Sequence, residues 1–380
     1  MGGPEMICED YRAWVEIDLS RLENNVIALM DLLPRGTELM GVIKANAYGH
    51  GSVDIAKRLV QSGVHHFAVA EIDEAIKLRN YGILEEILIL GYTPTHRLED
   101  LLVYDLTQTV VNAEDGERLG NFGKLIKVHV KIDTGLNRLG EPYVRTDKIL
   151  SIYRQKNLQI KGTFSHLAVA DSLQDRHVNF TRVQYNRLQK IAEHIRENGY
   201  NPGKIHILNS YGIINHPYMQ SDMVRPGLAI YGVLSKKDTS VGSKINLLPV
   251  LSLKARVSRV NKIKAGDSVG YGLSFTAARE SVVATVTIGY ADGIPRQLSK
   301  LGGEVLICGQ RASIIGNISM DQLSVDVTEI SNIRQGDIVT LIGQDGSETI
   351  SCEEIASLTG TITNELLSTI GDRVKRKIIK

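Results

Sequence analysis

Short apolar runs alternate with amphipathic stretches over the N-terminal part of the chain. An apolar run at 15–17 is followed by Leu22, Val26 and Leu29 at helical spacing, which predicts a strand and then a helix. Further apolar runs predict strands at 39–43, 67–70, 87–90, 109–111, 128–132, 160–164, 205–208 and 223–230. Helical stretches lie between most of them, notably at 72–78, 149–154 and 178–195. This alternation indicates repeated βαβ units and a parallel sheet.

The polar residues at the strand ends distinguish two folds with parallel sheets. About eight units fit a (β/α)8 barrel, whereas the alternation alone also allows a doubly wound open sheet. Residues with versatile chemistry follow the C-terminal ends of the predicted strands: Lys44, Arg138, His166, Asn209, Ser210 and Arg225. Barrel enzymes build their sites on that face. We therefore expect an α/β fold, a TIM-like (β/α)8 barrel with a site at its C-terminal rim.

The pattern changes after Leu234. Residues 235–243 form a polar connection, and beyond it apolar and polar positions alternate in predicted strands at 254–260, 281–288, 305–308, 312–315, 323–327 and 338–342. A closing helix is predicted over 352–370, with Ser351 and Glu354 spaced as a capping box. We expect an N-terminal extension or cloning remnant over 1–13, a barrel over 14–240 and a C-terminal, mostly-β domain over 241–380.

Charge and cysteine content exclude several classes of function. The 380 residues include 44 basic and 43 acidic ones, and a net charge of +1 offers little attraction for nucleic acid or an anionic membrane. The cysteines Cys8, Cys308 and Cys352 lie far apart, which favours a reducing, cytoplasmic compartment over a disulfide framework. Ten histidines form no metal-binding motif, so no metal is expected. No apolar run reaches the roughly 18 residues of a membrane span, so the expected partner is a small molecule.

One lysine stands out in the pattern. The apolar run 39–43 stops at Lys44 and gives way to small residues, among them Gly49 and Gly51. A lysine held at the end of a buried strand has a lowered pKa when its surroundings are dry, and a neutral amine can attack a carbonyl. Such lysines form Schiff bases, most often with pyridoxal phosphate. A lysine that merely extends its ammonium into solvent is the alternative for this residue alone.

The neighbours of Lys44 decide between these interpretations. The sequence V-I-K-A-N-A-Y-G-H-G around it resembles the lysine motif of the alanine racemase family, fold-type III enzymes that use pyridoxal phosphate. Two later segments, 208–212 and 224–231, resemble the family's phosphate-binding motifs, and Gly227 there would let backbone amides approach an anion. The resemblance implies these cofactor-binding residues: Lys44, Tyr48, His166, Asn209, Ser210, Arg225, Gly227 and Leu228.

The resemblance also implies a mechanism with two bases. Lys44 would serve one face of the substrate Cα, and Tyr271 would serve the other as the second base, helped to ionise by His166, Arg225 and Arg138. Arg225 would face the pyridine nitrogen, and because arginine offers only donors the nitrogen would stay unprotonated. In this family the tyrosine comes from the second subunit, which implies a head-to-tail homodimer with shared active sites.

Residues for the substrate follow from the same resemblance. They are Arg138, which would bind the substrate carboxylate, the backbone amide of Met320, Tyr290 at the entrance, and Asn364. Lys131 matches a lysine that is carbamylated in some members, and an unmodified lysine is the alternative. Asn364 departs from the family pattern, because alanine racemases carry a tyrosine there that contacts the phosphate.

Asparagine at position 364 resembles the VanT-type serine racemases of glycopeptide (vancomycin) resistance, whose catalytic domain follows a membrane domain. This resemblance implies a racemase of serine with alanine as a second substrate, and it implies an upstream membrane anchor outside this sequence. An alanine racemase proper, supplying D-alanine to the cell wall, is the alternative. A fold-type III decarboxylase would need a carboxylate in place of Arg225, and a vitamin B6 carrier would lack the β domain.

Overall fold

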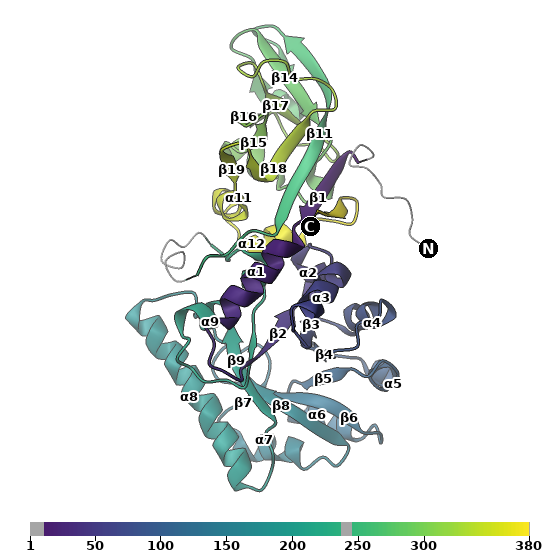
Figure 1. Ribbon diagram of the computed structural model, residues 1–380, viewed down its shortest axis with the longest axis vertical. Coiled ribbons are helices and arrows are strands. Elements are labelled where there is room, and N and C mark those ends of the chain that lie inside the picture. The colour runs from purple at the N-terminus through teal and green to yellow at the C-terminus, as the bar shows by residue number, and fades with distance from the viewer. Residues whose placement is uncertain (1–10, 237–244, 380) are drawn as a thin grey trace.

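The computed structural model describes residues 11–236 and 245–379 and shows a barrel below a second, sheet-rich domain (Figure 1). Among these residues, eight parallel strands close into the barrel: β2 (Glu38–Val42), β3 (His66–Val69), β4 (Glu86–Ile89), β5 (Thr107–Val110), β6 (Ile126–Asp133), β8 (Leu158–Phe164), β9 (Lys204–Asn209) and β10 (Met223–Arg225). They pair in the order β5-β4-β3-β2-β10-β9-β8-β6, and a further pairing of β5 with β6 closes the ring. The predicted α/β barrel is therefore confirmed.

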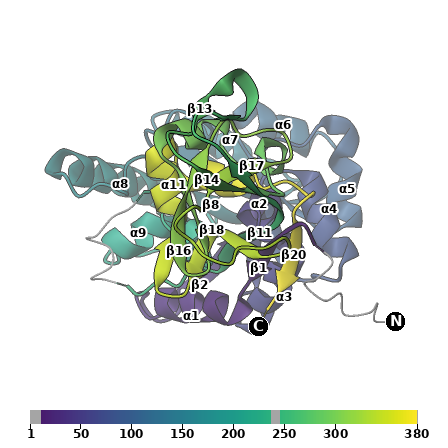
Figure 2. The same cartoon turned by 90° about the horizontal axis from the view of Figure 1, so that it is seen from above.

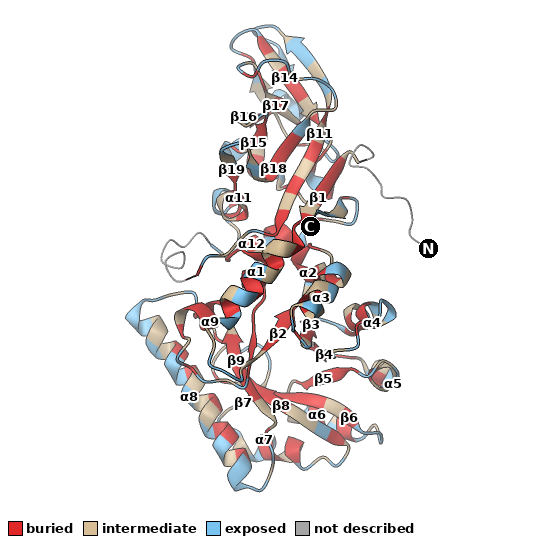
Figure 3. Cartoon of the chain, viewed as in Figure 1, coloured by how far each residue is buried: buried red, intermediate tan, exposed pale blue. Residues whose placement is uncertain are grey.

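Helices surround the barrel, as the view from above shows (Figure 2). They bury one apolar face against the strands, and the barrel strands are buried along most of their length (Figure 3). The predicted helices at 72–78, 149–154 and 178–195 correspond to α4 (Ile72–Asn80), α7 (Thr146–Tyr153) and α8 (Asp175–Glu197). The helices of this domain are α1 (Leu19–Met30), α2 (Lys44–Tyr48), α3 (Ser52–Gln61), α4 (Ile72–Asn80), α5 (Leu98–Val103), α6 (Ala113–Gly120), α7 (Thr146–Tyr153), α8 (Asp175–Glu197) and α9 (Ser210–Asn215), with 3₁₀ turns η2 (Thr95–Arg97) and η3 (Leu228–Tyr231) and a short strand β7 (Glu141–Pro142).

The second domain is built on one mixed sheet. Its strands in the described residues are β1 (Ala13–Ile17), β11 (Leu251–Ile263), β14 (Ser281–Val286), β15 (Glu304–Ile307), β16 (Gln310–Ile315), β17 (Leu323–Asp326), β18 (Ile338–Asp345), β19 (Glu348–Ile350) and β20 (Lys375–Ile378). The sheet order is β19-β18-β15-β16-β17-β14-β11-β1-β20, and β18 also pairs with β11, which curls the sheet on itself. A hairpin of β12 (Ser268–Val269) and β13 (Phe275–Thr276) projects from it.

The N-terminal strand differs from the expected domain division. β1 was expected within the barrel region 14–240, but it pairs with β11 and β20 in the second sheet. An apolar run predicts a strand, whereas the sheet that it joins depends on distant partners. Residues 1–10 of the expected extension, and the expected boundary at 240/241, lie outside the described residues.

The closing helix is also different. In place of one helix over 352–370 there are two, α11 (Cys352–Thr359) and α12 (Thr363–Ser368). Gly360, with a φ of 70°, ends α11 in the left-handed conformation that favours glycine. The Ser351 hydroxyl accepts a hydrogen bond from the Glu354 amide at 3.1 Å, as expected for the N-cap. The break turns α12 toward the barrel, where the Thr363 hydroxyl donates to the Leu234 carbonyl at 2.7 Å.

Candidate active site

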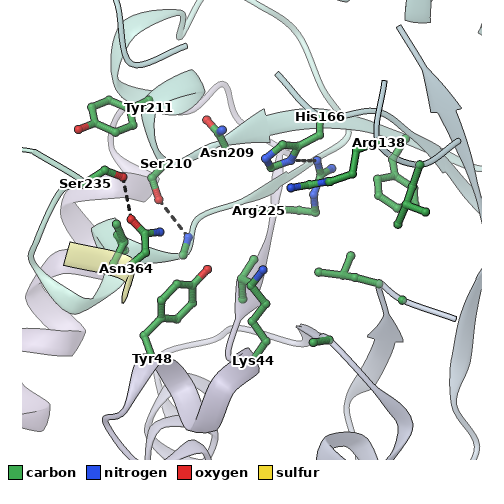
Figure 4. Close-up of a pocket in the computed structure, with 18 of the residues that line it drawn as sticks. Lys44, Tyr48, Arg138, His166, Asn209, Ser210, Tyr211, Arg225, Ser235 and Asn364 are labelled. Carbon is green, nitrogen blue, oxygen red and sulfur yellow. Dashed lines mark hydrogen bonds between the residues drawn. The ribbon is translucent and has the colours of Figure 1, made fainter. Parts of the chain in front are cut away.

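A cavity of about 430 Å³ opens at the C-terminal rim of the barrel, beneath α12. Most of the residues predicted from the sequence line it together (Figure 4): Lys44, Tyr48, Lys131, Arg138, His166, Asn209, Ser210, Arg225, Gly227, Leu228 and Asn364. They come from the ends of β2, β6, β8, β9 and β10 and from the second domain. Parallel strands bring their carboxyl ends to one edge, which explains how residues so distant in sequence meet.

Lys44 is placed by an uncommon backbone conformation. The four residues after it, Ala45 to Tyr48, all have positive φ, between 50° and 56°. L-residues visit this left-handed region at an energetic cost of about 1–2 kcal/mol each, so the turn is strained. Glu74 holds it from outside, because its carboxylate accepts hydrogen bonds from the Ala45 amide at 2.5 Å and the Ala70 amide at 2.7 Å. The strained turn fixes the lysine at the floor of the cavity.

The environment of Lys44 favours its neutral form. Burial lowers the pKa of Lys44, nearby Arg138 lowers it further, and Glu74 offsets part of the shift. A lowered pKa increases the fraction of free amine near neutral pH, and the free amine is the nucleophile in Schiff-base formation.

A cradle for an anion lies across the cavity from Lys44. The Ser210 hydroxyl accepts from the amides of Gly227 at 3.0 Å and Ala229 at 3.3 Å. A Cβ at position 227 would lie 2.8 Å from the Tyr48 hydroxyl, so only glycine leaves this space open. Burial raises the pKa of Tyr48 to about 12, which keeps its hydroxyl protonated as a donor. The hydroxyl groups of Ser210 and Tyr48 can donate into this open glycine cradle, which fits a phosphate group.

Arg225 forms the opposite wall. The residue is 4% exposed, and its guanidinium donates to the Ser165 carbonyl at 2.6 Å and to His206 Nδ1 at 2.5 Å. It also lies 5.0 Å from the centre of the Phe164 ring. Burial lowers the pKa of Arg225 to about 9, so the group remains a cation at neutral pH. A cationic donor fixed in this way suits an unprotonated ring nitrogen.

Two further groups in the cavity, Lys131 and His166, have lowered pKa values. Burial, together with the positive charges of Arg225 and Arg138, holds the pKa of Lys131 well below its ordinary value. Its Nζ lies 4.3 Å from the centre of the Phe164 ring. Burial and the same cations, with Lys131, lower the pKa of His166 in the same direction. The guanidinium groups of Arg138 and Arg225 supply the positive charge around this small space, which suits an anionic substrate.

Three predicted residues lie elsewhere in this chain. Tyr271, Tyr290 and Met320 are 75%, 41% and 53% exposed on the second domain, and none of them lines the cavity. They nevertheless gather on one surface, because Asn317 donates to the Tyr271 carbonyl at 2.7 Å. The Tyr290 and Ala291 amides donate to the carbonyls of residues 319 and 320 at 3.1 and 3.0 Å. We call this surface, residues 271, 290, 317 and 320, the tyrosine face.

Asn364 enters the cavity from α12. Its Oδ1 accepts from the Ser235 hydroxyl at 3.0 Å. Sequence reasoning missed Ser235, Phe164 and Glu74. Phe164 ends a barrel strand at the rim, which was a usable signal, but an apolar side chain there is usually assigned to the core. Glu74 lies on a helix that carries several other charged residues, so nothing in the sequence marked it.

None of the helices in the described part of the chain combines the length and the apolar character that crossing a membrane requires. Those same residues contain no group of three or more side chains suited to holding a metal ion.

Comparison with known proteins identifies the family. Residues 17–235 match the model of the alanine racemase N-terminal domain, and residues 250–378 match that of the alanine racemase C-terminal domain. An amino-acid racemase of Enterococcus faecalis is 44% identical over 365 residues, which are 96% of this chain and 51% of that protein. The chain thus spans about half the length of this relative. It spans 98% of an alanine racemase of Carboxydothermus hydrogenoformans, which is 41% identical over 96% of this chain.

A solved structure agrees. The alanine racemase of Bartonella henselae, with covalently bound pyridoxal phosphate, superposes with a TM-score of 0.85 at 31% identity, over 97% of this chain and all of that one. This supports the cofactor that the sequence predicted. The finer resemblance to serine racemases has no such support, since two of these three relatives are named alanine racemases. By its two domains and its cavity, the chain belongs to the alanine racemase family.

Proposed function

We propose that this chain is a pyridoxal-phosphate-dependent racemase of small amino acids, with alanine as its main substrate. The observation that supports this best is the amine of Lys44, held with a lowered pKa between the anion cradle and Arg225. When bound, pyridoxal phosphate supplies a conjugated ring that acidifies the α-proton of an attached amino acid. The names of the relatives favour alanine over serine.

Different residues would bind different parts of the cofactor. Lys44 would bond its aldehyde, and Arg225 would donate to its ring nitrogen. Tyr48, Asn209, Ser210 and the backbone at Gly227 and Leu228 would hold its phosphate. Arg138 would bind the substrate carboxylate, because its guanidinium offers a bidentate fork. Such positioning leaves the α-proton within reach of the Lys44 amine on one side.

The second base is proposed to come from a second copy of the chain. Tyr271 is exposed and its surface carries Tyr290 and Met320, two other residues expected at the active site. A head-to-tail homodimer would place the tyrosine face of one subunit over the cavity of the other. Each site would then have Lys44 on one face of the substrate and the partner subunit's Tyr271 on the other, as racemisation requires.

We also propose that Lys131 is carbamylated. Its pKa is lowered by burial and by two arginines, so its neutral amine can attack CO₂ and release a proton to give a carbamate anion. That anion would offset the charge of Arg138 and orient its guanidinium toward the substrate.

Serine is the second candidate substrate, and Asn364 is the observation that favours it. Asparagine is smaller than the family's tyrosine, and its amide can both donate to and accept from a substrate hydroxyl. One such hydrogen bond contributes roughly 0.5–1.5 kcal/mol, about one decade in preference at most. Asn364 Oδ1 already accepts from Ser235 and keeps a second lone pair, so both this oxygen and the amide nitrogen can meet a substrate hydroxyl.

Side-by-side kcat/KM values for L-alanine and L-serine test this proposal. We expect turnover of alanine at the higher rate and of serine at a measurable one. Asn364→Tyr should lower kcat/KM for serine and leave that for alanine equal or higher. Parallel changes for the two substrates would contradict the role of Asn364 in selection, and turnover of neither would contradict the proposed function.

A further inference from the structure

A column of polar side chains runs through the barrel interior below Arg225. Barrel interiors are usually filled by layers of branched apolar residues. Here the inward positions of four different strands carry His206 on β9, His129 on β6, Glu86 on β4 and His66 on β3. The two histidines at the centre are 0% and 1% exposed. Buried polar groups are almost always hydrogen-bonded, and each member of this column contacts the next.

The contacts determine which ring nitrogen carries the proton in His206 and in His129. Arg225 can only donate, so His206 must accept through Nδ1 at 2.5 Å and carry its proton on Nε2. That nitrogen lies 2.7 Å from His129 Nδ1, which must therefore accept in turn. The proton of His129 is then on its own Nε2, and this nitrogen lies 3.7 Å from Glu86 Oε1, a distance of electrostatic contact rather than of a hydrogen bond. A cation and a carboxylate at opposite ends select one tautomer in both imidazoles.

The surrounding residues are shaped to admit the column. A Cβ at Gly162 would lie 2.7 Å from His129 Nδ1, so the ring fits only because residue 162 has no side chain. The Phe164 ring stacks on His206 with centroids 4.8 Å apart and planes 5° apart, and the same ring supports the Arg225 guanidinium. His206 can therefore not turn away from Arg225 without losing this stacking.

Glu86 ends the column as a carboxylate. Burial acts to raise its pKa, but His129 and His66 outweigh burial and hold the pKa well below its ordinary value. The Thr107 hydroxyl also donates to it at 3.2 Å. Burial lowers the pKa of both His129 and His206, despite the opposing effect of Glu86 on His129, which agrees with neutral imidazoles between the two charges.

We propose that Glu86 is a positioning residue for Arg225, acting from the opposite end of the barrel through the tautomers of His129 and His206. Its carboxylate keeps the His129 proton on Nε2 and so keeps both Nδ1 atoms free to accept. Without that acceptor, the proton of His129 can move to Nδ1, where it meets the proton on His206 Nε2. His206 would then have to move its own proton to Nδ1, and Arg225 would lose its acceptor there. The consequence for the cofactor ring rests on the proposed function, whereas the tautomers themselves do not.

Nitrogen-15 NMR of the full-length chain, labelled only in histidine, tests the column directly. Side-chain ¹⁵N shifts distinguish Nδ1–H from Nε2–H imidazoles. We expect the Nε2–H form for both His129 and His206 near neutral pH, with or without added pyridoxal phosphate. A proton on Nδ1 of either ring, or a doubly protonated ring, in the wild-type chain would overturn the proposal.

Substitutions of Glu86 test the role of its carboxylate. Glu86→Leu should give a mixture of tautomers at His129, weaken pyridoxal phosphate binding and lower kcat/KM by about tenfold. Glu86→Gln keeps an acceptor and should restore most of the pyridoxal phosphate binding and most of kcat/KM.

Glu38→Leu is the matched control, because Glu38 lies at the same end of the barrel, 2.8 Å from His66, without touching His129. Unchanged His129 and His206 signals in Glu86→Leu, or equal effects in the control, would contradict the proposal. Expected tautomers in a chain without racemase activity would instead contradict only the proposed function.

Discussion

At the scale of single residues, the site depends on backbone strain as much as on side-chain chemistry. Ala45 is exposed yet held at a φ of 51°. Ala45→Gly should raise the free energy of unfolding by about 1 kcal/mol, because glycine tolerates the left-handed region. Ala28 provides the control, since it lies inside the right-handed helix α1 and the same change there should lower stability by about 0.5–1 kcal/mol. Urea unfolding of both variants gives the two signs. Destabilisation by Ala45→Gly would show that the turn is not strained.

A second prediction at this scale concerns the effect of His50 on stability at different pH values. Its Nδ1 donates to the Ala47 and Tyr48 carbonyls, and burial lowers its pKa to about 4 from an ordinary 6.5. Between these values the unfolded chain binds a proton that the folded chain does not, so stability falls as the pH falls. From pH 7 to 5 the loss should be about 2 kcal/mol from this residue. His50→Asn keeps the donor without the titration, so its stability should fall by correspondingly less in unfolding curves at the two pH values. Equal losses in both proteins would contradict the assignment.

At the scale of elements, β20 supports the lysine turn. Arg376 on this strand donates through Nε to the Gly49 carbonyl at 2.9 Å, and its other nitrogens donate to the carbonyls of residues 370, 371 and 374. Arg376→Ala should lower the free energy of unfolding by about 3 kcal/mol and weaken pyridoxal phosphate binding, because the turn holding Lys44 loses its support. Lys375→Ala removes a charge from an exposed neighbour and should do neither. Cofactor titration and unfolding of the two variants separate these outcomes.

The elements also show what the sequence can predict. The barrel strands were predictable because each is a short apolar run between turns, and the residues at their ends form the cavity by the geometry of parallel strands. The sheet that β1 joins was not predictable, because its partners Leu253 and Arg376 lie hundreds of positions away. The column from Arg225 to Glu86 was not predictable for the same reason. Each of its histidines alone looks like an ordinary core residue.

At the scale of the whole molecule, the proposed two-base mechanism requires two subunits. Lys44→Ala and Tyr271→Phe should each be inactive in racemisation. Mixing them should restore about a quarter of the wild-type sites when subunits exchange at random, since one site in each mixed dimer receives both intact residues. Racemase activity after confirmed subunit exchange measures this. No recovery would place both bases within one chain.

Exchange of the α-proton in heavy water, followed for each enantiomer of alanine with Tyr271→Phe, tests the central claim most directly. The two bases act on opposite faces, so removing one should leave the other at work. We predict that Tyr271→Phe still incorporates deuterium into D-alanine through Lys44 while incorporation into L-alanine is lost. Equal loss of deuterium incorporation from both enantiomers would contradict the two-base racemase proposed for this chain.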